Sequence, residues 1–238
     1  MRITILTMFP EMLASLQNSP IVMHAERDQI LDLEIVDIRE YAGGSYRHID
    51  DSPYGGGAGM IIRCQPVLDA LKDVKTEESW TVLPSPVGKV FDQKKAHELV
   101  KKKHLILIAG HYEGIDARVY AHCDEMLSLG DYVLSAGEYA CMDIADAVVR
   151  LLDGVIKKES TEEESFENGL LEYPQYTKPE CYEGEHVPSV LLSGDHEKIR
   201  KWRLRKSLET TLKYRPDLLE KKDLSEEEQD MLDEIRKQ

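Results

Sequence analysis

Short apolar segments of the strand type alternate with amphipathic segments of the helix type from residue 2 to residue 152. Ile, Leu and Val dominate the strand-like segments, which lie at 2–9, 31–38, 80–84, 104–110 and 124–130. The helix-like segments lie at 11–29, 65–73, 92–103, 115–122 and 137–152. Strands that alternate with helices form a parallel sheet with helices on both faces. The sequence therefore predicts an α/β domain.

The composition changes after Gly154. Residues 157–169 are charged and almost without apolar side chains, which is typical of a linker. An amphipathic helix is predicted from about residue 196 to residue 212. A last helix should begin at Ser225, because Glu228 follows it at the spacing of a capping box. We therefore expect three parts, which are a larger α/β domain at 1–156, a linker at 157–168 and a small helical domain at 169–238.

The composition bounds the class of protein. The chain has 238 residues, 42% of them hydrophobic, which is enough to bury a proper core. It has no run of about 18 apolar residues and no signal-peptide pattern, so we interpret it as a cytoplasmic protein without a membrane segment. Its four cysteines never form a C-x-x-C pair, which argues against a zinc knuckle or a disulfide framework and favours reduced core thiols.

The charge is unevenly distributed. A net charge of −15 argues against a nucleic-acid partner, because phosphate binding needs Lys and Arg. Between Asp195 and Arg215, however, eight basic and three acidic residues give a net charge of +5. This basic segment is either a binding face on an acidic protein or a solvated helix whose charges pair at i,i+4 spacing. The charge pattern alone leaves both interpretations open.

Glycine is concentrated in "DDSPYGGGAGM" at 50–60, where four of the five residues from Gly55 to Gly59 are glycines. Glycine is used where the backbone needs a positive φ or lies close to a ligand. The spacing does not fit the G-x-G-x-x-G that follows the first strand of a dinucleotide-binding fold. The "SPVGKV" at 85–90 also lacks the upstream glycine and the following Ser or Thr of a P-loop. Both nucleotide motifs are therefore excluded.

Three other loops follow predicted strands and are rich in glycine or proline. They are "SPVGKVFD" at 85–92, "AGHYEGID" at 109–116 and "LGDYVLSAGE" at 129–138. Each of these loops taken alone is ordinary turn chemistry. Ligands of open α/β sheets bind beyond the carboxyl ends of the strands, so three such loops in succession predict one shared pocket.

These segments carry a resemblance to a known family. In chain order, "DDSPYGGGAGM", "SPVGKVFDQ", "AGHYEGIDARV", "LGDYVLSAGE", "ESFENGLLEYPQYTKPE" and "LLSGDHEKIRKWR" resemble the successive motifs of bacterial tRNA (guanine-N1)-methyltransferases, the TrmD family of the SPOUT superfamily. The resemblance runs nearly end to end. It implies a parallel sheet with a deep trefoil knot that forms the S-adenosylmethionine site. It also implies a homodimer whose active sites draw on both subunits, and a C-terminal domain that holds tRNA.

The resemblance further implies methyl transfer from S-adenosylmethionine to N1 of the guanine at tRNA position 37, next to the anticodon. Mg²⁺ is implied as well, although no carboxylate spacing marks its ligands. The positions that match donor-binding residues of the family are Ser85, Pro86, Gly110, Tyr112, Glu113, Gly114, Leu129, Gly130, Asp131, Tyr132, Val133, Leu134 and Gly137. Where the family usually has two glycines this chain has Ala136 and Gly137, which places a methyl group beside the donor.

The positions that the resemblance assigns to tRNA fall in two segments. The first holds Asp50, Tyr54, Gly55, Gly56 and Gly57, with Asp51 beside them. The two aspartates are expected to shape the wall of the site and to help hold Arg150 or Mg²⁺. A flexible surface hairpin is the alternative for this segment. The second segment lies in the basic stretch and contains Ser193, Gly194, His196, Lys198, Arg200, Trp202 and Arg203.

The catalytic pair of the family corresponds to Arg150 and Glu164. The family usually has "EDSF" or "DDSF" where this chain has "EESF", so a glutamate replaces the aspartate. Guanine N1 carries a proton and needs a base, for which Glu164 is the candidate. Arg150 would stabilise the negative charge that spreads to O6. Without the resemblance, Arg150 is a solvated charge near a helix C-terminus and Glu164 is one linker acid among several.

Two other functions remain open from the sequence. The first is a SPOUT-class methyltransferase that acts on another RNA site, such as a ribose hydroxyl. The second is a non-catalytic RNA-binding protein that has kept the fold.

Overall fold

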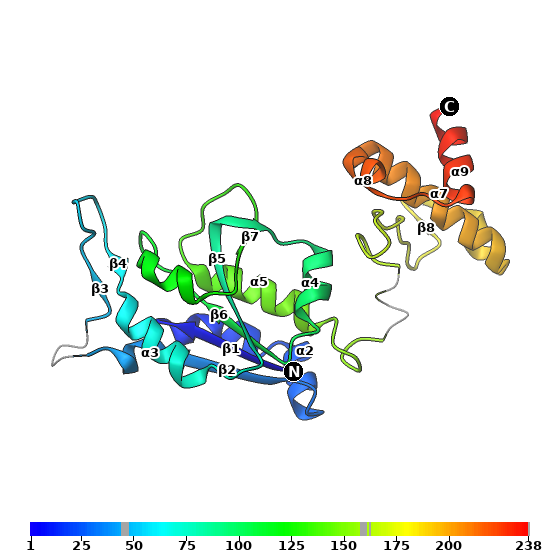
Figure 1. Ribbon diagram of the computed structural model, residues 1–238. Helices are drawn as coiled ribbons and strands as arrows, with labels where there is room; N and C mark the ends of the chain where they lie inside the picture. Colours follow the sequence, from blue (N-terminus) through cyan, green and yellow to red (C-terminus); the bar gives the residue numbers. More distant parts are fainter. Residues whose placement is uncertain (44–47, 158–160, 162, 238) are drawn as a thin grey trace. The chain divides into compact units, whose positions relative to one another are not determined.

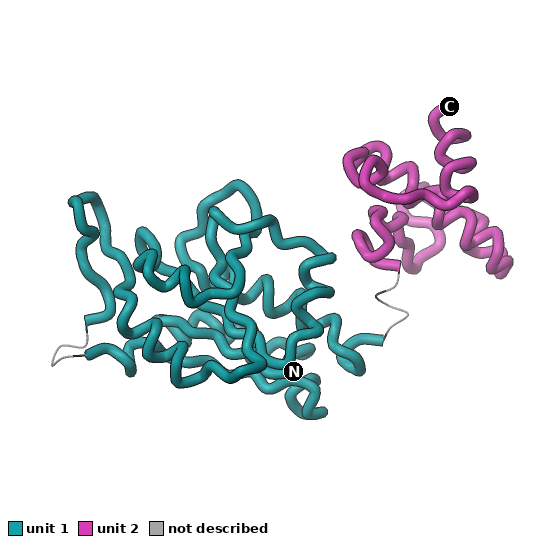
Figure 2. Tube along the Cα trace, viewed as in Figure 1, with its two compact units in different colours: residues 1–157 teal, residues 158–238 magenta. Residues whose placement is uncertain are grey.

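The chain folds into two compact units, residues 1–157 and 158–238 (Figure 2). The computed structural model describes residues 1–43, 48–157, 161 and 163–237. Four residues of the predicted linker, 158–160 and 162, thus lie outside the described residues. Within these ranges, no helix has both the length and the apolar character needed to cross a membrane.

Unit 1 is built on a five-stranded parallel sheet with the order β2-β1-β6-β5-β7 (Figure 1). The strands are β1 (Arg2–Thr7), β2 (Asp32–Asp37), β5 (Ser79–Val90), β6 (His104–Ile108) and β7 (Glu125–Ser128). The predicted α/β class and its five strands are confirmed. β5 is longer than the predicted 80–84, and its pairing with β7 shifts register between Pro84 and Lys89.

Helices cover both faces of this sheet. One core, which includes Ile5 and Leu107, packs against η1 (Pro10–Leu13), α1 (Ala14–Gln17), α2 (Pro20–Arg27), α4 (Gln93–Leu99) and α5 (Gly137–Val149). The other core, which includes Leu6 and Ile106, packs against η2 (Ile38–Tyr41), α3 (Cys64–Val74) and η3 (Ala117–His122). Neighbouring strand residues such as Ile5 and Leu6 enter different cores because side chains alternate across a strand.

The prediction of one continuous helix at 11–29 was wrong. The segment is divided into η1, α1 and α2, with the last break just before Pro20. Proline has no backbone N–H and opposes a continuing helix, but it fits the first position of a new one. The Ser19 side chain caps this new helix by accepting a hydrogen bond from the Val22 amide at 3.3 Å.

Unit 2 is mainly helical. Its elements are a short hairpin of β8 (Cys181–Tyr182) and β9 (Glu185–His186), then η4 (Ser189–Leu192), α7 (His196–Tyr214), α8 (Pro216–Lys221) and α9 (Glu226–Arg236). Its core is formed by Leu170, Leu208, Leu219 and Leu232. The predicted capping box of Ser225 and Glu228 is present at the start of α9. Cys181 is exposed, so the prediction that all four cysteines are core thiols was wrong.

Candidate functional site: a glycine-lined cavity at the strand ends

A cavity of about 230 Å³ lies where β5 shifts register and where β6 and β7 end. The three predicted loops all contribute to its walls. Every residue predicted to bind the methyl donor lines this cavity except Asp131. Ala136, whose methyl group was expected beside the donor, also lines the cavity, and the donor motifs did not predict the other lining residues, namely Pro84, His111, Leu127, Ser128, Ser135 and Ala140. The structure therefore gathers segments that are about 50 residues apart in the sequence into one concave site.

Two glycines allow backbone to lie directly against backbone around the cavity. The Gly137 amide donates a hydrogen bond to the Gly110 carbonyl at 2.7 Å, and a Cβ on Gly137 would lie 2.5 Å from the Gly110 nitrogen. A Cβ on Gly88 would lie 2.4 Å from the Leu127 nitrogen. Ala136, by contrast, is buried in extended backbone before α5 and lines the cavity. Glycine is therefore required at 88 and 137 by the chain itself.

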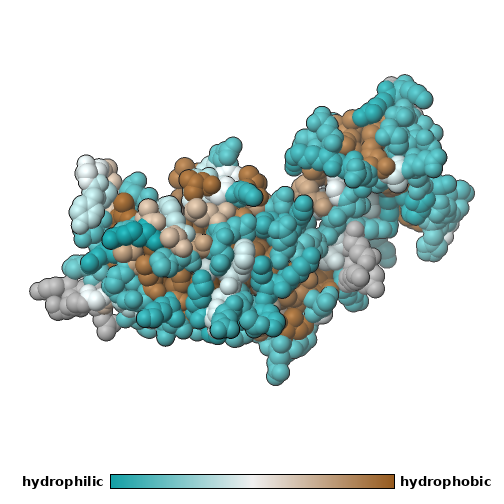
Figure 3. All heavy atoms as spheres, viewed as in Figure 1, coloured by the Kyte–Doolittle hydropathy of each residue, from teal (hydrophilic) through white to brown (hydrophobic). Residues whose placement is uncertain are grey.

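Apolar side chains are exposed beside the cavity. Val133 is 93% exposed, and Val87, Val90, Tyr132 and Leu134 are exposed as well. Figure 3 shows hydrophobic residues on the upper surface of unit 1, over the loops beyond β5 and β7. Such a rim offers apolar contact to a planar, uncharged ring system.

A buried carboxylate lies behind the cavity wall. Glu138, in the first turn of α5, is fully buried, and its Oε1 accepts a hydrogen bond from the Thr7 hydroxyl at 2.6 Å. The same hydroxyl oxygen accepts one from the Phe9 amide at 2.9 Å. Glu138 Oε2 lies 3.6 Å from His111 Nδ1, and neither atom has a hydrogen-bond partner among the described residues. Because His111 lines the cavity, Glu138 connects this wall to the end of β1.

The glycine-rich segment forms the tip of a hairpin between β3 (Asp50–Asp51) and β4 (Ile61–Ile62), which projects at one end of unit 1 in Figure 1. Gly55, Gly56, Gly57 and Gly59 all have positive φ, which explains the glycines. Nothing described lies within 4 Å of a Cβ placed on Gly55 or Gly56. A Cβ on Gly59, however, would lie 2.6 Å from Glu113 Oε1. The close neighbour at the base of this loop is thus a residue of the cavity.

The remaining predicted residues of the hairpin are accessible. Asp50 is half-buried, Asp51 is exposed, and Tyr54 at the tip is fully exposed. The Asp51 carboxylate accepts a hydrogen bond from the Ser52 amide at 2.8 Å.

The two predicted catalytic residues lie in different units. Arg150 is the C-cap of α5 in unit 1, and its amide donates to the Asp146 carbonyl at 3.1 Å. Glu164 belongs to unit 2, where its amide donates to the Thr161 carbonyl and its own carbonyl accepts from the Glu167 amide, both at 3.3 Å. Both side chains are half-buried. Glu164 therefore sits in a hydrogen-bonded turn at the start of unit 2.

The predicted tRNA residues of unit 2 surround the start of α7. Ser193 and Gly194 precede the helix, and Gly194 has a φ of 70°. The Asp195 side chain caps α7 by accepting from the Lys198 amide at 3.1 Å, and His196 is the first helical residue. Trp202 packs near Tyr176, with ring centroids 6.3 Å apart.

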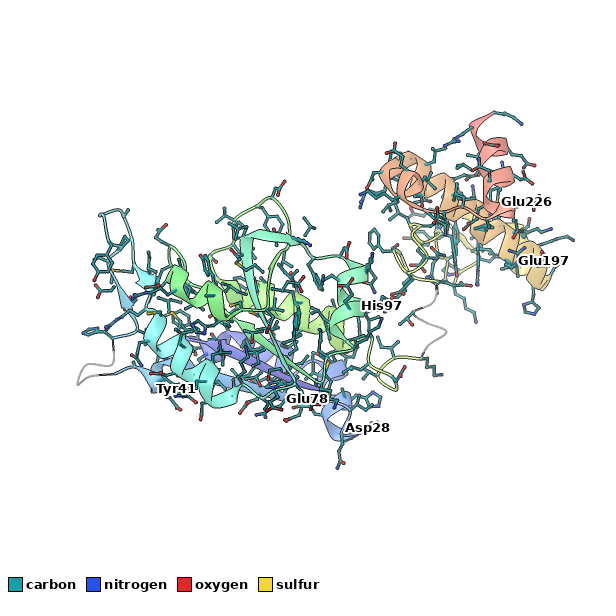
Figure 4. All side chains as sticks on the ribbon, in the orientation of Figure 1. Asp28, Tyr41, Glu78, His97, Glu197 and Glu226 are labelled. Carbon is teal, nitrogen blue, oxygen red and sulfur yellow. The ribbon has the colours of Figure 1, made fainter. Side chains whose placement is uncertain are left out.

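Carboxylates pair with most bases of the segment from Asp195 to Arg215. Arg200 binds both Glu197 and Glu227, at 2.9 and 2.6 Å, and Arg205 binds both Glu209 and Glu234. Glu197 and Glu226, the neighbour of Glu227, are labelled on α7 and α9 in Figure 4. The remaining pairs are Lys198–Asp195, Lys201–Glu197, Lys206–Glu209, Arg203–Glu163 and Arg215–Asp217. Acids distant in the sequence thus offset much of the local positive charge.

No group of three or more His, Cys, Asp or Glu side chains is placed to hold a metal ion within residues 1–43, 48–157, 161 and 163–237. The implied Mg²⁺ therefore has no protein cluster that fits it in this part of the chain.

Comparison with known proteins agrees with the motifs. The model of the family tRNA (Guanine-1)-methyltransferase TrmD matches residues 1–221. A tRNA (guanine-N(1)-)-methyltransferase of Clostridium botulinum (strain Kyoto / Type A2) is 52% identical, over 100% of this chain and 99% of its own. Proteins of the same name from Clostridium beijerinckii and Clostridium novyi are 52% and 51% identical, over 96% and 98% of this chain and 96% and 97% of their own. The chain therefore belongs to the tRNA (guanine-1)-methyltransferase family TrmD.

Proposed function

We propose that the protein transfers a methyl group from S-adenosylmethionine to N1 of the guanine at tRNA position 37. The observation that carries this proposal is the single cavity that collects nearly all residues of the three donor motifs, in a chain whose relatives of the same length bear the name tRNA (guanine-N(1)-)-methyltransferase. The function is therefore supported by the site as well as by family membership.

The cavity fits the methyl donor by its chemistry. Glycines at 110, 114, 130 and 137 put no side chain into the cavity, so main chain forms part of its wall and leaves room for a ring system such as adenine. Val133 and Leu134 supply apolar contact for its faces, and the Tyr112 and Tyr132 rings lie in the same wall. The donor, when bound, supplies an electrophilic methyl group. The residues of the cavity bind and orient it and keep water from it.

Glu164 and Arg150 are the residues that would act on guanine. N1 is a poor nucleophile until its proton is removed, and the Glu164 carboxylate is the base that accepts this proton. Negative charge then spreads to O6, where the Arg150 guanidinium stabilises it. A free glutamate has a pKa of about 4.3 and is a weak base for such a proton, so positioning of both groups contributes to the rate.

The proposal includes a homodimer and a knot. In the dimer, the Glu164 segment of one chain completes the cavity of the other, which accounts for the separation of the pair into two units. The knot would pass the chain through the loops that line the cavity. Gly88 against Leu127 and Gly137 against Gly110 support it, because a threaded chain needs places where backbones cross without side chains.

Recognition of tRNA is assigned to two surfaces. On unit 1 it is the hairpin tip, with Asp50, Tyr54, Gly55, Gly56 and Gly57. On unit 2 it is the start of α7, with Ser193, Gly194, His196, Lys198 and Trp202. Recognition of a base in a tRNA loop requires that the base is turned out of its stack. Arg203 belongs to the same stretch, but its guanidinium already donates a hydrogen bond to Glu163 and lies over the Tyr173 ring.

The test is methylation of a single tRNA transcript with isotope-labelled donor, followed by identification of the modified nucleoside. We expect 1-methylguanine when position 37 is guanine and no product when it is adenine. A ribose-methylated nucleoside would instead support a methyltransferase for another RNA site. The absence of both methylation and donor binding by calorimetry would indicate a non-catalytic RNA-binding protein.

A further inference from the structure

Glu163, the residue before the candidate base, is held by two side chains of unit 2. The Tyr173 hydroxyl donates a hydrogen bond to Glu163 Oε2 at 2.5 Å, and Arg203 donates to the same oxygen at 3.2 Å. The Arg203 guanidinium also lies over the Tyr173 ring, 4.9 Å from its centroid. These three residues, the Glu163 cluster, attach the segment before Glu164 to helix α7.

The cluster combines three contacts, which are an ion pair, a hydrogen bond and a cation–π contact. Burial, together with the hydrogen bond to Glu163, raises the pKa of Tyr173 to about 12. Arg203 Nε is buried and has no hydrogen-bond partner within the described part of the chain. Its side chain is 41% exposed, whereas that of Lys198 on the same helix is 73% exposed. Arg203 is thus directed toward the protein more than toward solvent.

The segment after Glu164 is attached to the same unit. The Ser165 hydroxyl accepts a hydrogen bond from the Glu172 amide at 2.9 Å, and Leu170 is buried in the core of unit 2. The Leu171 amide donates to the Thr211 hydroxyl of α7, also at 2.9 Å. Glu164 therefore lies between two attachments to α7, and the Glu163 cluster is the one on its N-terminal side.

We infer that Tyr173 and Arg203 are positioning residues, which act through Glu163 to hold the Glu164 carboxylate for proton removal. This inference rests on the proposed function. A misplacement of about 1 Å in a catalytic group lowers a rate by as much as about 10²-fold, so loss of one attachment should reduce the rate. It also follows that Glu163, whose Oε2 receives two donors, does not substitute for Glu164 as the base. Arg203 then contributes to the rate of methyl transfer and does not contribute to the affinity for tRNA.

The test compares Tyr173→Phe, Arg203→Ala and Arg203→Lys with Arg205→Ala, a matched control on α7. Arg205 also binds two carboxylates, Glu209 and Glu234, but neither is near the Glu164 segment in the sequence. With saturating tRNA and donor, we expect the first three variants to lower the single-turnover rate about tenfold, with the tRNA Kd within about twofold of wild type. Arg205→Ala should keep the wild-type rate. Arg203→Lys should not rescue the rate, because lysine lacks the planar group that stacks and donates together.

A double variant tests whether the effect passes through Glu163. Glu163→Ala combined with Arg203→Ala should be no slower than Glu163→Ala alone, because both changes remove the same attachment. An increased tRNA Kd for Arg203→Ala, restored by Arg203→Lys and with an unchanged saturated rate, would make Arg203 a phosphate contact and overturn the inference.

Hydrogen exchange provides a readout that does not depend on methylation. In the free protein, the amides from Glu164 to Glu167 should exchange faster in Tyr173→Phe and Arg203→Ala than in wild type, and not in Arg205→Ala. If the wild-type protein makes no 1-methylguanine, the proposed function fails while this measurement still decides whether the cluster holds the segment. Unchanged exchange in both variants overturns the inference even when the enzyme is active.

Discussion

The Gly137 amide hydrogen-bonds to the Gly110 carbonyl at 2.7 Å, and the two backbones are too close for a side chain between them. This contact joins the start of α5 to the loop after β6, and both residues line the cavity. The shape of the cavity that we propose for the donor therefore depends on a glycine that is needed for packing.

Gly137→Ala should damage both the fold and donor binding. Its Cβ would meet the Gly110 backbone, which has no flexible side chain that can move away. We expect a loss of about 2 kcal/mol in the free energy of unfolding, measured in urea, and a loss of donor binding in calorimetry. Ala136→Gly is the matched control and should bind the donor like wild type. Wild-type stability of Gly137→Ala would contradict the close contact.

Thr7→Val should destabilise unit 1 although it keeps the size of the side chain. The substitution removes the hydroxyl that donates to the buried Glu138 carboxylate at 2.6 Å. Leaving a buried acceptor without its donor costs about 2 kcal/mol, and more if the group is charged. Thr7→Ser keeps the hydroxyl and should lie close to wild type. Equal unfolding free energies for the two variants would show that the hydrogen bond contributes nothing.

Lys198→Ala should weaken tRNA binding in a salt-dependent way. If Lys198 contacts one phosphate, the slope of log Kd against log salt should become shallower by about 0.7 to 1, with donor affinity unchanged. Because most neighbouring bases already bind carboxylates, the total slope of the wild type should be smaller than eight phosphate contacts would give. An unchanged tRNA affinity of Lys198→Ala at moderate salt would indicate that this segment is a solvated helix surface and not a binding face.

Glu164→Gln keeps the size of the candidate base and removes its basicity. Turnover should fall by about 10²-fold or more, with donor and tRNA binding little affected. Glu164→Asp should retain activity, with a reduced rate where the shorter side chain shifts the carboxylate. Single-turnover kinetics are the deciding measurement, because a chemical step that stays fast in Glu164→Gln removes this residue from the mechanism.

Mixed dimers test the proposed homodimer, in which each active site would draw on both chains. Arg150→Ala and Glu164→Ala should each be inactive alone. After subunit exchange, random pairing of equal amounts should restore roughly a quarter of the wild-type activity, because half of the dimers are mixed and hold one complete site. No recovery after demonstrated exchange would indicate that both residues of a site come from one chain.

Local signals in the sequence located much of the fold. The spacing of Ser225 and Glu228 predicted a helix start that the structure confirms, because a capping box depends only on residues three apart. The effect of Pro20 was equally local, but the apolar periodicity of 11–29 concealed it. The loops around the cavity were predicted from their place after the strands, because parallel strands end at one edge of a sheet.

The features that the sequence did not reveal depend on partners far along the chain. Glu138 has the same local pattern as any acid in a first helical turn, and only its contact with Thr7 shows it to be a buried acceptor. The basic segment was counted over neighbouring residues, whereas Glu163 and Glu227, which bind two of its arginines, lie outside it. A sum of charges over neighbouring residues cannot predict that acids from other segments neutralise these arginines.

The glycine hairpin divides into an anchored base and an unobstructed tip. At the base, the Glu113 amide donates to the Met60 carbonyl at 3.1 Å and the Ile62 amide to the Gly114 carbonyl at 3.0 Å, while the Gly59 backbone lies against Glu113. At the tip, Tyr54 is fully exposed, and a Cβ placed on Gly55 or Gly56 would meet open space. A fluorophore attached through Tyr54→Cys, in a protein whose exposed Cys181 is replaced by serine, would therefore leave the cavity undisturbed. Its emission would report the approach of tRNA to this side of the protein in real time.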